Sequence, residues 1–362
     1  MRPPLTAEDL EAEARRALPA EVFDFIAGGA DDESTLRANV EAFRSLHLRP
    51  RRLVDVSEID VSTSLLGSPV AAPLFVPPMA SHRLVNPEGE LASAAAAGDT
   101  GVGYITSLAA STSLEDVAEV AGRPRWVQVY MYRDREVTAD LIRRAEAAGY
   151  EGVCLTIDAP VFGRRYRDLR NRFRQPDDVP LSNLVKYGLA DLPDSDDGSA
   201  IQAYVTRTLD PSTTWADLEW VRSRGSGQVL LKGIMIAEDA RRAVDAGVDA
   251  LIVSNHGGRQ LGRLPGTIEV LEEVVEAVGG RLPVLVDGGV RSGVDVAIAL
   301  ALGAAGVGVG RPLLWALACG GRDLLADYLR ALVEDLGRTL ALAGAATLDE
   351  LDPSFVDRRP PG

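Results

Sequence analysis

The sequence has few of the features that mark secreted, cysteine-rich or membrane-spanning proteins. It contains only two cysteines, Cys154 and Cys319, far apart in the chain, so neither a disulfide framework nor a cysteine metal site is expected. No apolar run reaches the ~18 residues of a membrane helix. The N-terminal residues pass from a Pro-Pro pair into an acidic amphipathic helix without the apolar core of a signal peptide. We therefore expect a cytoplasmic protein.

Positive charge is also scarce relative to negative charge. The chain has 38 Lys and Arg against 53 Asp and Glu, which gives a formal net charge of −15. Such a surface repels phosphate backbones and anionic lipids, so neither nucleic acid nor a membrane is an expected partner. Hydrophobic residues make up 46% and charged residues 25%, which is typical of a folded globular protein.

A repeated pattern of helix, glycine and buried strand predicts the fold class. Ala-rich or amphipathic stretches end at Gly98, Gly149, Gly247 and Gly303, and an apolar run follows each of them a few residues later. Helices are expected at 88–97, 114–120, 137–148, 237–246, 268–278 and 294–302. Eight strands are expected at 74–77, 103–106, 126–130, 153–157, 229–232, 251–254, 284–287 and 307–310.

Strands that alternate with helices indicate βαβ units and a parallel sheet. Eight such units over about 240 residues favour one closed α/β barrel of the (β/α)₈ (TIM) type, within a single domain that spans 1–362. An open doubly wound Rossmann sheet is the alternative, although no G-x-G-x-x-G follows a first strand.

Two segments fall outside this pattern. Residues 1–70 contain a helix that a capping box from Thr6 to Asp9 would open, and then a strand-like stretch expected to form a plug and hairpin at the bottom of the barrel. Residues 167–214, between the fourth strand and its helix, carry acidic and proline-containing clusters. They are too long for an ordinary connection, so they predict either a lid over the rim or a disordered loop.

The last two strand ends predict a phosphate site. Asp287 is followed by Gly289 and Arg291, and Gly310 by Arg311, each at the start of a predicted helix. Glycines expose backbone N–H groups, the helix dipole favours an anion, and arginines bind phosphate with two N–H groups. Two glycine-lined turns with helix caps are the alternative.

A histidine at another strand end is a candidate base. His256 precedes two glycines, and Arg259 follows three residues on, so a titratable group and a cation lie together on the predicted rim. That pair suits removal of a proton from an anionic substrate. A lone histidine is more often structural, and His82, after the first strand, is a weaker candidate for the site.

These residues belong to motifs that carry a resemblance. In chain order they are FDFIAGGADDE, NPEGE, VQVYMYRDR, LTIDAP, GRRYRD, SNHGGRQL, DGGVRSG and GRP, and the similarity runs from about residue 7 to 345. Together they resemble the FMN-dependent 2-hydroxy acid oxidase and dehydrogenase family, which includes glycolate oxidase, lactate oxidase and mandelate dehydrogenase.

The resemblance implies a set of FMN-binding residues. The phosphate would lie on Gly289, Arg291, Gly310 and Arg311, with Asp287 on the ribityl chain. Lys232 would lie near N1 and O2 of the ring, where a cation stabilises the reduced anionic flavin. The other residues implied to touch the cofactor are Pro78, Met79, Ala80, Ser107, Gln128, Thr156 and Ser254.

The resemblance also implies oxidation of an L-2-hydroxy acid to the 2-oxo acid. His256 would act as the base, Asp158 would stabilise its protonated form, and Tyr130 would contact the substrate oxygens. Arg165 and Arg259 would hold the substrate carboxylate. Either O₂ or another acceptor could reoxidise the flavin. The hydrogen on the substrate carbon could leave as a hydride or as a proton. A homo-oligomer is expected, a tetramer being one arrangement.

Departures from the family pattern bear on the substrate. Phe25 stands where a tyrosine hydroxyl commonly reaches the substrate carboxylate, and Ala109 stands where glycolate-specific members carry a bulky aromatic. We therefore expect an aryl or larger alkyl side chain on the substrate. Two alternatives stay open: an FMN enzyme of the same fold acting on another substrate, as an isomerase or on an amine or peptide-derived intermediate, and a non-catalytic flavin-binding protein.

Overall fold

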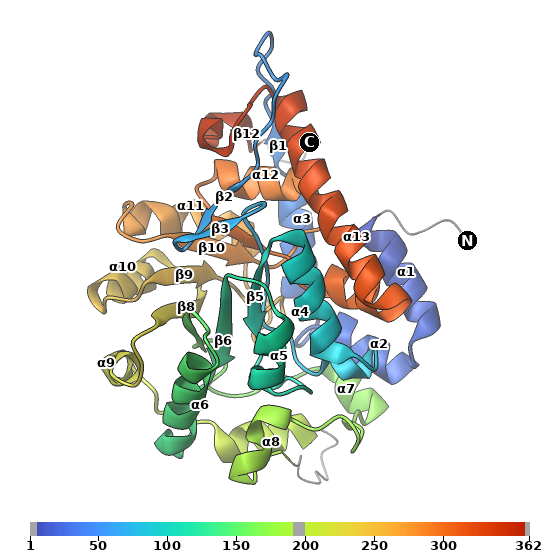
Figure 1. Cartoon of the computed structure of the whole chain (residues 1–362), viewed down its shortest axis with the longest axis vertical. Coiled ribbons are helices and arrows are strands. Elements are labelled where there is room, and N and C mark those ends of the chain that lie inside the picture. The colour runs from blue at the N-terminus through green and yellow to red at the C-terminus, as the bar shows by residue number, and fades with distance from the viewer. Residues whose placement is uncertain (1–5, 191–199, 359–362) are drawn as a thin grey trace.

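Eight parallel strands close into a barrel at the centre of the molecule (Figure 1). The computed structural model describes residues 6–190 and 200–358. Around the barrel the strand order is β10-β11-β4-β5-β6-β7-β8-β9. Their bounds are β4 (Leu74–Val76), β5 (Gly103–Thr106), β6 (Arg125–Val129), β7 (Gly152–Thr156), β8 (Gln228–Ile234), β9 (Ala250–Val253), β10 (Val284–Asp287) and β11 (Gly306–Gly308). The predicted barrel is confirmed, with every strand end within two residues of its expected position, and the doubly wound sheet is wrong.

Helices follow the strands and cover the outside of the barrel. They are α4 (Gly89–Thr100), α5 (Leu114–Val120), α6 (Arg135–Ala147), α9 (Asp217–Arg222), α10 (Ala237–Asp245), α11 (Thr267–Val278), α12 (Gly293–Ala301) and α13 (Arg311–Ala343). The glycine pattern marks their ends because Gly149, Gly247 and Gly303 have positive φ, which a residue without Cβ adopts at no steric cost. In the first repeat the glycine with positive φ is Gly101, not Gly98. Helix α4 therefore runs past Gly98 and ends at Thr100.

The N-terminal segment supplies three helices and a hairpin. The helices are α1 (Ala7–Ala17), α2 (Ala20–Ala27) and α3 (Ser34–Arg44), and Thr6 and Asp9 form the predicted capping box of α1. Strands β2 (Thr63–Leu65) and β3 (Ser68–Val70) form the hairpin. Its Leu65 and Val70 pack against side chains of the barrel interior, such as Trp126. The hairpin therefore closes one end of the barrel, and α7 (Tyr166–Asn171) and α8 (Ala200–Thr208) lie toward the other end (Figure 1).

The segment between β7 and α9 contains regular structure. Its elements are α7 (Tyr166–Asn171), the 3₁₀ helix η2 (Ser182–Tyr187) and α8 (Ala200–Thr208). For its described residues the disordered-loop alternative is therefore wrong, while the acidic cluster at 191–199 lies outside the described residues. The remaining elements are short: η1 (His82–Leu84), η3 (Leu348–Glu350), η4 (Pro353–Phe355), and β1 (His47–Leu48), which pairs with β12 (Val356–Asp357). Within the described ranges no helix is both long and apolar enough to cross a membrane.

Candidate active site

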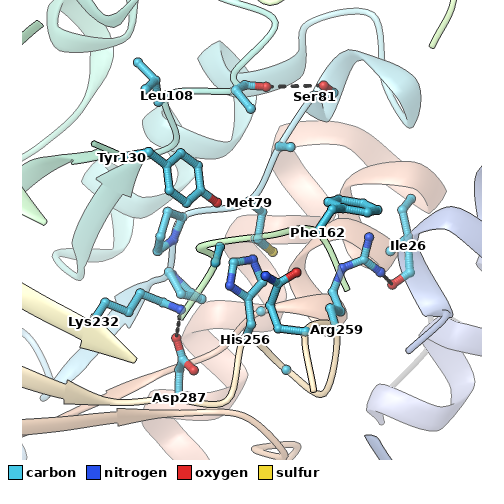
Figure 2. A pocket seen from close by; sticks show the side chains of 18 of the residues that line it. Ile26, Met79, Ser81, Leu108, Tyr130, Phe162, Lys232, His256, Arg259 and Asp287 are labelled. Atoms are coloured by element: carbon cyan, nitrogen blue, oxygen red, sulfur yellow. Dashed lines mark hydrogen bonds and ion pairs between the residues drawn. The ribbon is translucent and has the colours of Figure 1, made fainter. Parts of the chain in front are cut away.

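A large cavity opens at the carboxyl ends of the barrel strands, where active sites of this fold form (Figure 2). Most of the residues that the sequence singled out lie in its wall, although they come from segments far apart in the chain. These are Phe25, Pro78, Met79, Ala80, Ala109, Tyr130, Arg165, Lys232, His256, Arg259, Asp287, Gly289, Arg291, Gly310 and Arg311.

Five predicted site residues do not line this cavity but lie close to residues that do; four of them are buried, and 13% of the Asp158 side chain is accessible. They are Ser107, Gln128, Thr156, Asp158 and Ser254. Gln128 Oε1 accepts the backbone N–H of Leu108, a wall residue, at 3.2 Å. Ser254 Oγ accepts a hydrogen bond from the Lys232 ammonium at 2.8 Å and donates one to Asp287 at 2.6 Å. Ser254 therefore holds two residues of the wall in place.

His256 lies at the turn after β9 in a strained backbone conformation. Its φ is +59°, and the two glycines that follow also have positive φ. A Cβ at Gly258 would lie 2.5 Å from the backbone nitrogen of Leu36, so only glycine fits there. The turn thus places the imidazole in the cavity wall, where 23% of the side chain is accessible. A non-glycine residue at positive φ costs about 1–3 kcal/mol and is common at functional sites.

Asp158 orients the imidazole and fixes its tautomer. His256 Nδ1 lies 2.9 Å from Asp158 Oδ1. Burial tends to raise the pKa of the Asp158 carboxyl, but His256 and Lys232 outweigh it and hold that pKa below its usual value. The carboxylate can then only accept, so Nδ1 carries the hydrogen and Nε2 is left as a proton acceptor.

The protonation state of His256 suits a base. Burial lowers the pKa of the imidazole below its usual 6.5, with Lys232 and Arg165 acting in the same direction, while Asp158 raises it. The lowering wins, so the ring is neutral at neutral pH. By contrast, burial raises the pKa of Tyr130 to about 12, and its hydroxyl remains a hydrogen-bond donor.

This balance predicts the pH dependence of the reaction. Because the neutral imidazole is the active form, kcat/KM should be lost as the pH falls through the His256 pKa, below 6.5. Removing the Asp158 charge should lower that pKa further. In Asp158→Asn the acid limb should therefore move about 1–3 pH units down, with a lower plateau. Stopped-flow reduction of the flavin at a series of pH values measures the position of the acid limb and the plateau rate. An acid limb at the same pH in the native enzyme and in Asp158→Asn would show that Asp158 does not set the His256 pKa.

Two arginines beside His256 form a binding place for an anion. Arg165 is 7% exposed and its Nε donates to the carbonyl oxygen of Arg259, while Arg259 Nη1 donates to the carbonyl oxygens of Phe25 and Gly28. Among the described residues no carboxylate lies within 4 Å of either guanidinium. Burial lowers the pKa of both, and their mutual repulsion lowers that of Arg165 further. Buried Asp168 raises the pKa of both without forming an ion pair with either, so two cations that lack a close anion favour a ligand carboxylate.

Figure 2 shows how these groups face one another. The Tyr130 hydroxyl, the His256 ring and the Arg259 guanidinium border the same space, and the Lys232 ammonium lies behind it, 3.5 Å from Asp287. Asp287 and Asp158 more than offset the effect of burial, so the pKa of Lys232 lies above its usual value and the group stays cationic.

The cavity wall also contains the helix starts predicted to bind phosphate. Gly289 has φ +93°, and α13 begins at Arg311 directly after Gly310. Burial lowers the pKa of Arg291, and no carboxylate of the described residues pairs with its side chain. Arg311 differs from the expectation: three of its N–H groups donate to the carbonyl oxygens of Ile26, Gly28 and Gly257. Much of its hydrogen-bonding capacity therefore joins α2 to the rim.

Comparisons with known proteins agree with this geometry. A family model described as FMN-dependent dehydrogenase matches residues 14–358. The chain belongs to this family. It is 46% identical to a peroxisomal (S)-2-hydroxy-acid oxidase of Oryza sativa subsp. japonica, covering 98% of the chain and 96% of the relative. It is 43% identical to an L-lactate oxidase of Nostoc sp., covering 98% of each. A crystal structure of mandelate oxidase with (S)-4-hydroxymandelic acid matches at 44% identity and a TM-score of 0.93, again over 98% of each chain.

Membership of the FMN-dependent dehydrogenase family confirms the predicted class of enzyme and its cofactor. The described residues fit FMN on two observations. Gln128 Nε2 is buried without a hydrogen-bond partner among them, as a donor awaiting an acceptor would be. Half-buried Arg291 lies beside glycine-rich turns at two helix starts, which suits a phosphate.

The structure also separates the other histidine from the site. His82 is buried, its Nδ1 bonds Ser93 Oγ at 2.8 Å, and it does not line the cavity. Conversely, sequence reasoning missed apolar wall residues from the segment between β7 and α9, because its acidic clusters dominated the pattern. These are Leu181, Leu184, Tyr204, Val205 and Leu209. Their helical spacing within 181–184 and 204–209 was the available signal.

Proposed function

We propose that this enzyme oxidises L-2-hydroxy acids that carry an aryl or larger alkyl side chain to the 2-oxo acids. The observation that carries the proposal is a pair of arginines, Arg165 and Arg259, that form no ion pair with any carboxylate of the described residues and lie next to the His256 and Asp158 pair. The first pair suits a substrate carboxylate, and the second suits removal of the proton from a neighbouring hydroxyl. The relatives named as 2-hydroxy acid, lactate and mandelate oxidases support this assignment.

In this proposal each residue of the wall has a separate task. Arg165 and Arg259 bind the carboxylate, and Tyr130 donates to a substrate oxygen. His256 Nε2 takes the hydroxyl proton, and the charge that develops on the ring is stabilised by Asp158. Bound FMN supplies the acceptor for the two electrons that leave the substrate.

Other residues in and around the cavity would hold FMN. We propose that Arg291, Arg311, Gly289 and Gly310 hold its phosphate, and that Asp287 binds the ribityl chain. Lys232 would place a cation beside the ring, and the remaining contacts would come from Pro78, Met79, Ala80, Ser107, Gln128, Thr156 and Ser254. These residues either line the cavity or are buried close to its wall.

The apolar part of the cavity wall supports a large substrate side chain. Phe25 stacks on Phe173 with ring centroids 4.4 Å apart, and it offers no hydroxyl to the carboxylate. Ala109 leaves space that an aromatic residue would fill, beside Leu108 and Leu184. An apolar side chain buried here would gain about 25 cal/mol per Å². A small substrate loses a hydrogen bond worth ~1.5–3 kcal/mol at Phe25 and has no surface to offset it.

We therefore expect kcat/KM to rise from glycolate through lactate to mandelate-like or long-chain 2-hydroxy acids. Anaerobic titration of the enzyme with each acid, followed by bleaching of the flavin, measures the order. The double substitution Phe25→Tyr with Ala109→Trp should move the preference back toward glycolate. A native enzyme that already prefers glycolate would disprove the proposed side chain.

The electron acceptor, the compartment and the assembly are further proposals. We propose O₂ as the acceptor because the relatives are named as oxidases, and H₂O₂ release on readmitting air tests it. Homologues are peroxisomal in plants, whereas we propose a cytoplasmic enzyme here. The expected homo-oligomer can be measured by light scattering.

A further inference from the structure

The apolar wall of the substrate cavity is positioned by a polar cluster outside it. Leu184 of η2 and Leu181 directly before it line the cavity with apolar side chains. Leucine contacts are non-directional, so they fill space without specifying an exact position. What holds η2 against the barrel therefore sets the shape of this side of the pocket.

Asn183, between these two leucines, is the first connection. It is 0% exposed, and its side-chain oxygen accepts the backbone N–H of Leu114 at 2.7 Å. Its Nδ2 donates to the carbonyl oxygens of Ser107 at 3.4 Å and Leu108 at 3.3 Å. One amide thus ties η2 to the loop that carries Leu108 and Ala109, the facing part of the wall.

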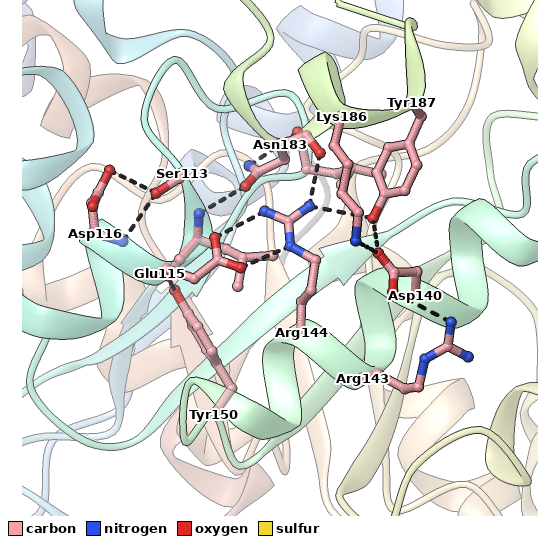
Figure 3. Close-up of polar contacts among 12 residues, drawn as sticks. Ser113, Glu115, Asp116, Asp140, Arg143, Arg144, Tyr150, Asn183, Lys186 and Tyr187 are labelled. Carbon is pink, nitrogen blue, oxygen red and sulfur yellow. Dashed lines mark hydrogen bonds and ion pairs between the residues drawn. The ribbon is translucent and has the colours of Figure 1, made fainter.

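Arg144, on α6, is the second connection (Figure 3). Its Nε and Nη2 bind both carboxylate oxygens of Glu115 on α5, at 2.7 and 2.8 Å. Its Nη1 donates to the backbone oxygen of Asn183 at 3.0 Å and to the Tyr187 hydroxyl at 3.3 Å. The guanidinium therefore joins α5, α6 and η2, and its side chain is only 18% exposed.

The outer part of the cluster is weaker. Asp140 accepts from the Tyr187 hydroxyl at 2.5 Å and from the Lys186 ammonium at 2.7 Å, which lowers its pKa to about 2. Arg143 also pairs with Asp140, at 3.3 Å. Lys186 and Arg143 are more than half exposed, where ion pairs contribute little. The bidentate Arg144 to Glu115 pair and the buried Asn183 amide carry most of the connection.

We propose that Arg144 and Asn183 are positioning residues that determine substrate size specificity, by holding Leu181 and Leu184 at the distance from Ala109 that a large side chain needs. Neither residue lines the cavity. The groups that bind the carboxylate and take the proton lie on other segments, so a substrate without a side chain should not sense the cluster. The inference rests on the proposed function only in assuming that large 2-hydroxy acids are turned over.

Arg144→Met in the FMN-loaded enzyme tests the proposal. The KM for mandelate should rise roughly 3- to 30-fold, the range over which substitutions without ligand contact alter a distant site, while kcat/KM for glycolate stays within about twofold. Arg143→Met is the matched control: it removes the neighbouring arginine of the same helix, whose partners are Asp140 and Glu136, and should change neither value. Arg144→Lys keeps the charge without the bidentate geometry and should fall between.

Tyr187→Phe tests the proposal if Arg144→Met does not fold. It removes only one hydroxyl group, on the surface side of the cluster, and is therefore expected to disturb folding less. It should raise the mandelate KM selectively, by a smaller factor. Equal losses for both substrates would reduce the cluster to a stability role, and unchanged constants in Arg144→Met would also overturn the proposal. The wild-type ranking of substrates tests the proposed function separately. The mandelate KM of Arg144→Met divided by that of Arg143→Met reports on Arg144 whichever acid the native enzyme prefers.

Discussion

Replacing His256 by asparagine is expected to slow flavin reduction by a 2-hydroxy acid by about 10²- to 10⁴-fold, the contribution of general-base catalysis. The amide can still donate a hydrogen bond to Asp158, but it has no basic nitrogen at the position of Nε2. Asparagine also tolerates positive φ better than most residues, so the turn before Gly257 and Gly258 should keep its shape. FMN content should be unchanged, since the residues proposed to hold its phosphate lie elsewhere in the cavity.

The rate is measured by anaerobic stopped flow at saturating substrate. His47→Asn is the control, because His47 is exposed on β1 and should leave the rate unaltered. His82→Asn removes the buried histidine that bonds Ser93 and should alter stability more than the rate. If His256→Asn were reduced at nearly the native rate, another group would have to take the proton, and the assignment of His256 would be wrong.

The barrel itself was predictable because each of its strands is a short apolar run next to a helix with a glycine at its end. Strand register follows from the closed parallel arrangement, so the polar residues after each run had to meet at one rim. The fold and the positions of the strand ends therefore predict that one cavity contains His256, Tyr130, Lys232 and Arg259. Their hydrogen-bond partners did not, because they depend on contacts between segments remote in sequence.

Arg164 and Arg165 illustrate that limit. They are adjacent and chemically identical, and both follow β7, yet Arg164 is exposed and Arg165 is buried in the cavity wall. Arg165 stacks on Phe162 at 4.0 Å and bonds the carbonyl oxygen of Arg259. The preference of one arginine over the other came from the family resemblance, since the loop geometry that separates them is not encoded in local spacing.

The segment between β7 and α9 shows a second limit. Its acidic and proline-containing clusters resemble a disordered loop, because composition is judged over a window and not by what the few apolar residues contact. In the fold, Leu181 and Leu184 find a partner surface on the rim and Asn183 is satisfied by three backbone groups of the loop at 107–114. Tertiary contacts of this kind outweigh local composition.

Replacing Arg165 by methionine is expected to weaken binding of substrate carboxylates by ~2–5 kcal/mol, or roughly 30- to 5,000-fold. Methionine keeps much of the apolar contact with Phe162 but removes a buried cation that forms no ion pair with a carboxylate of the described residues. Arg165 is a cleaner target than Arg259, whose Nη1 also supports the end of α2 through three carbonyl oxygens. The measurement is the Kd of a 2-oxo acid product, from its perturbation of the flavin absorbance.

Arg164→Met is the matched control. Arg164 is the adjacent residue and is exposed, so this substitution removes an equal charge from the surface and should change the Kd little. The amide of the same hydroxy acid is the second control: without a carboxylate it should lose little affinity in Arg165→Met compared with the native enzyme. A loss that is equal for acid and amide would mean that Arg165 shapes the pocket through its contact with Phe162. An unchanged Kd for the acid would leave Arg259 as the residue that binds the carboxylate, because its guanidinium is the other cation proposed to do so.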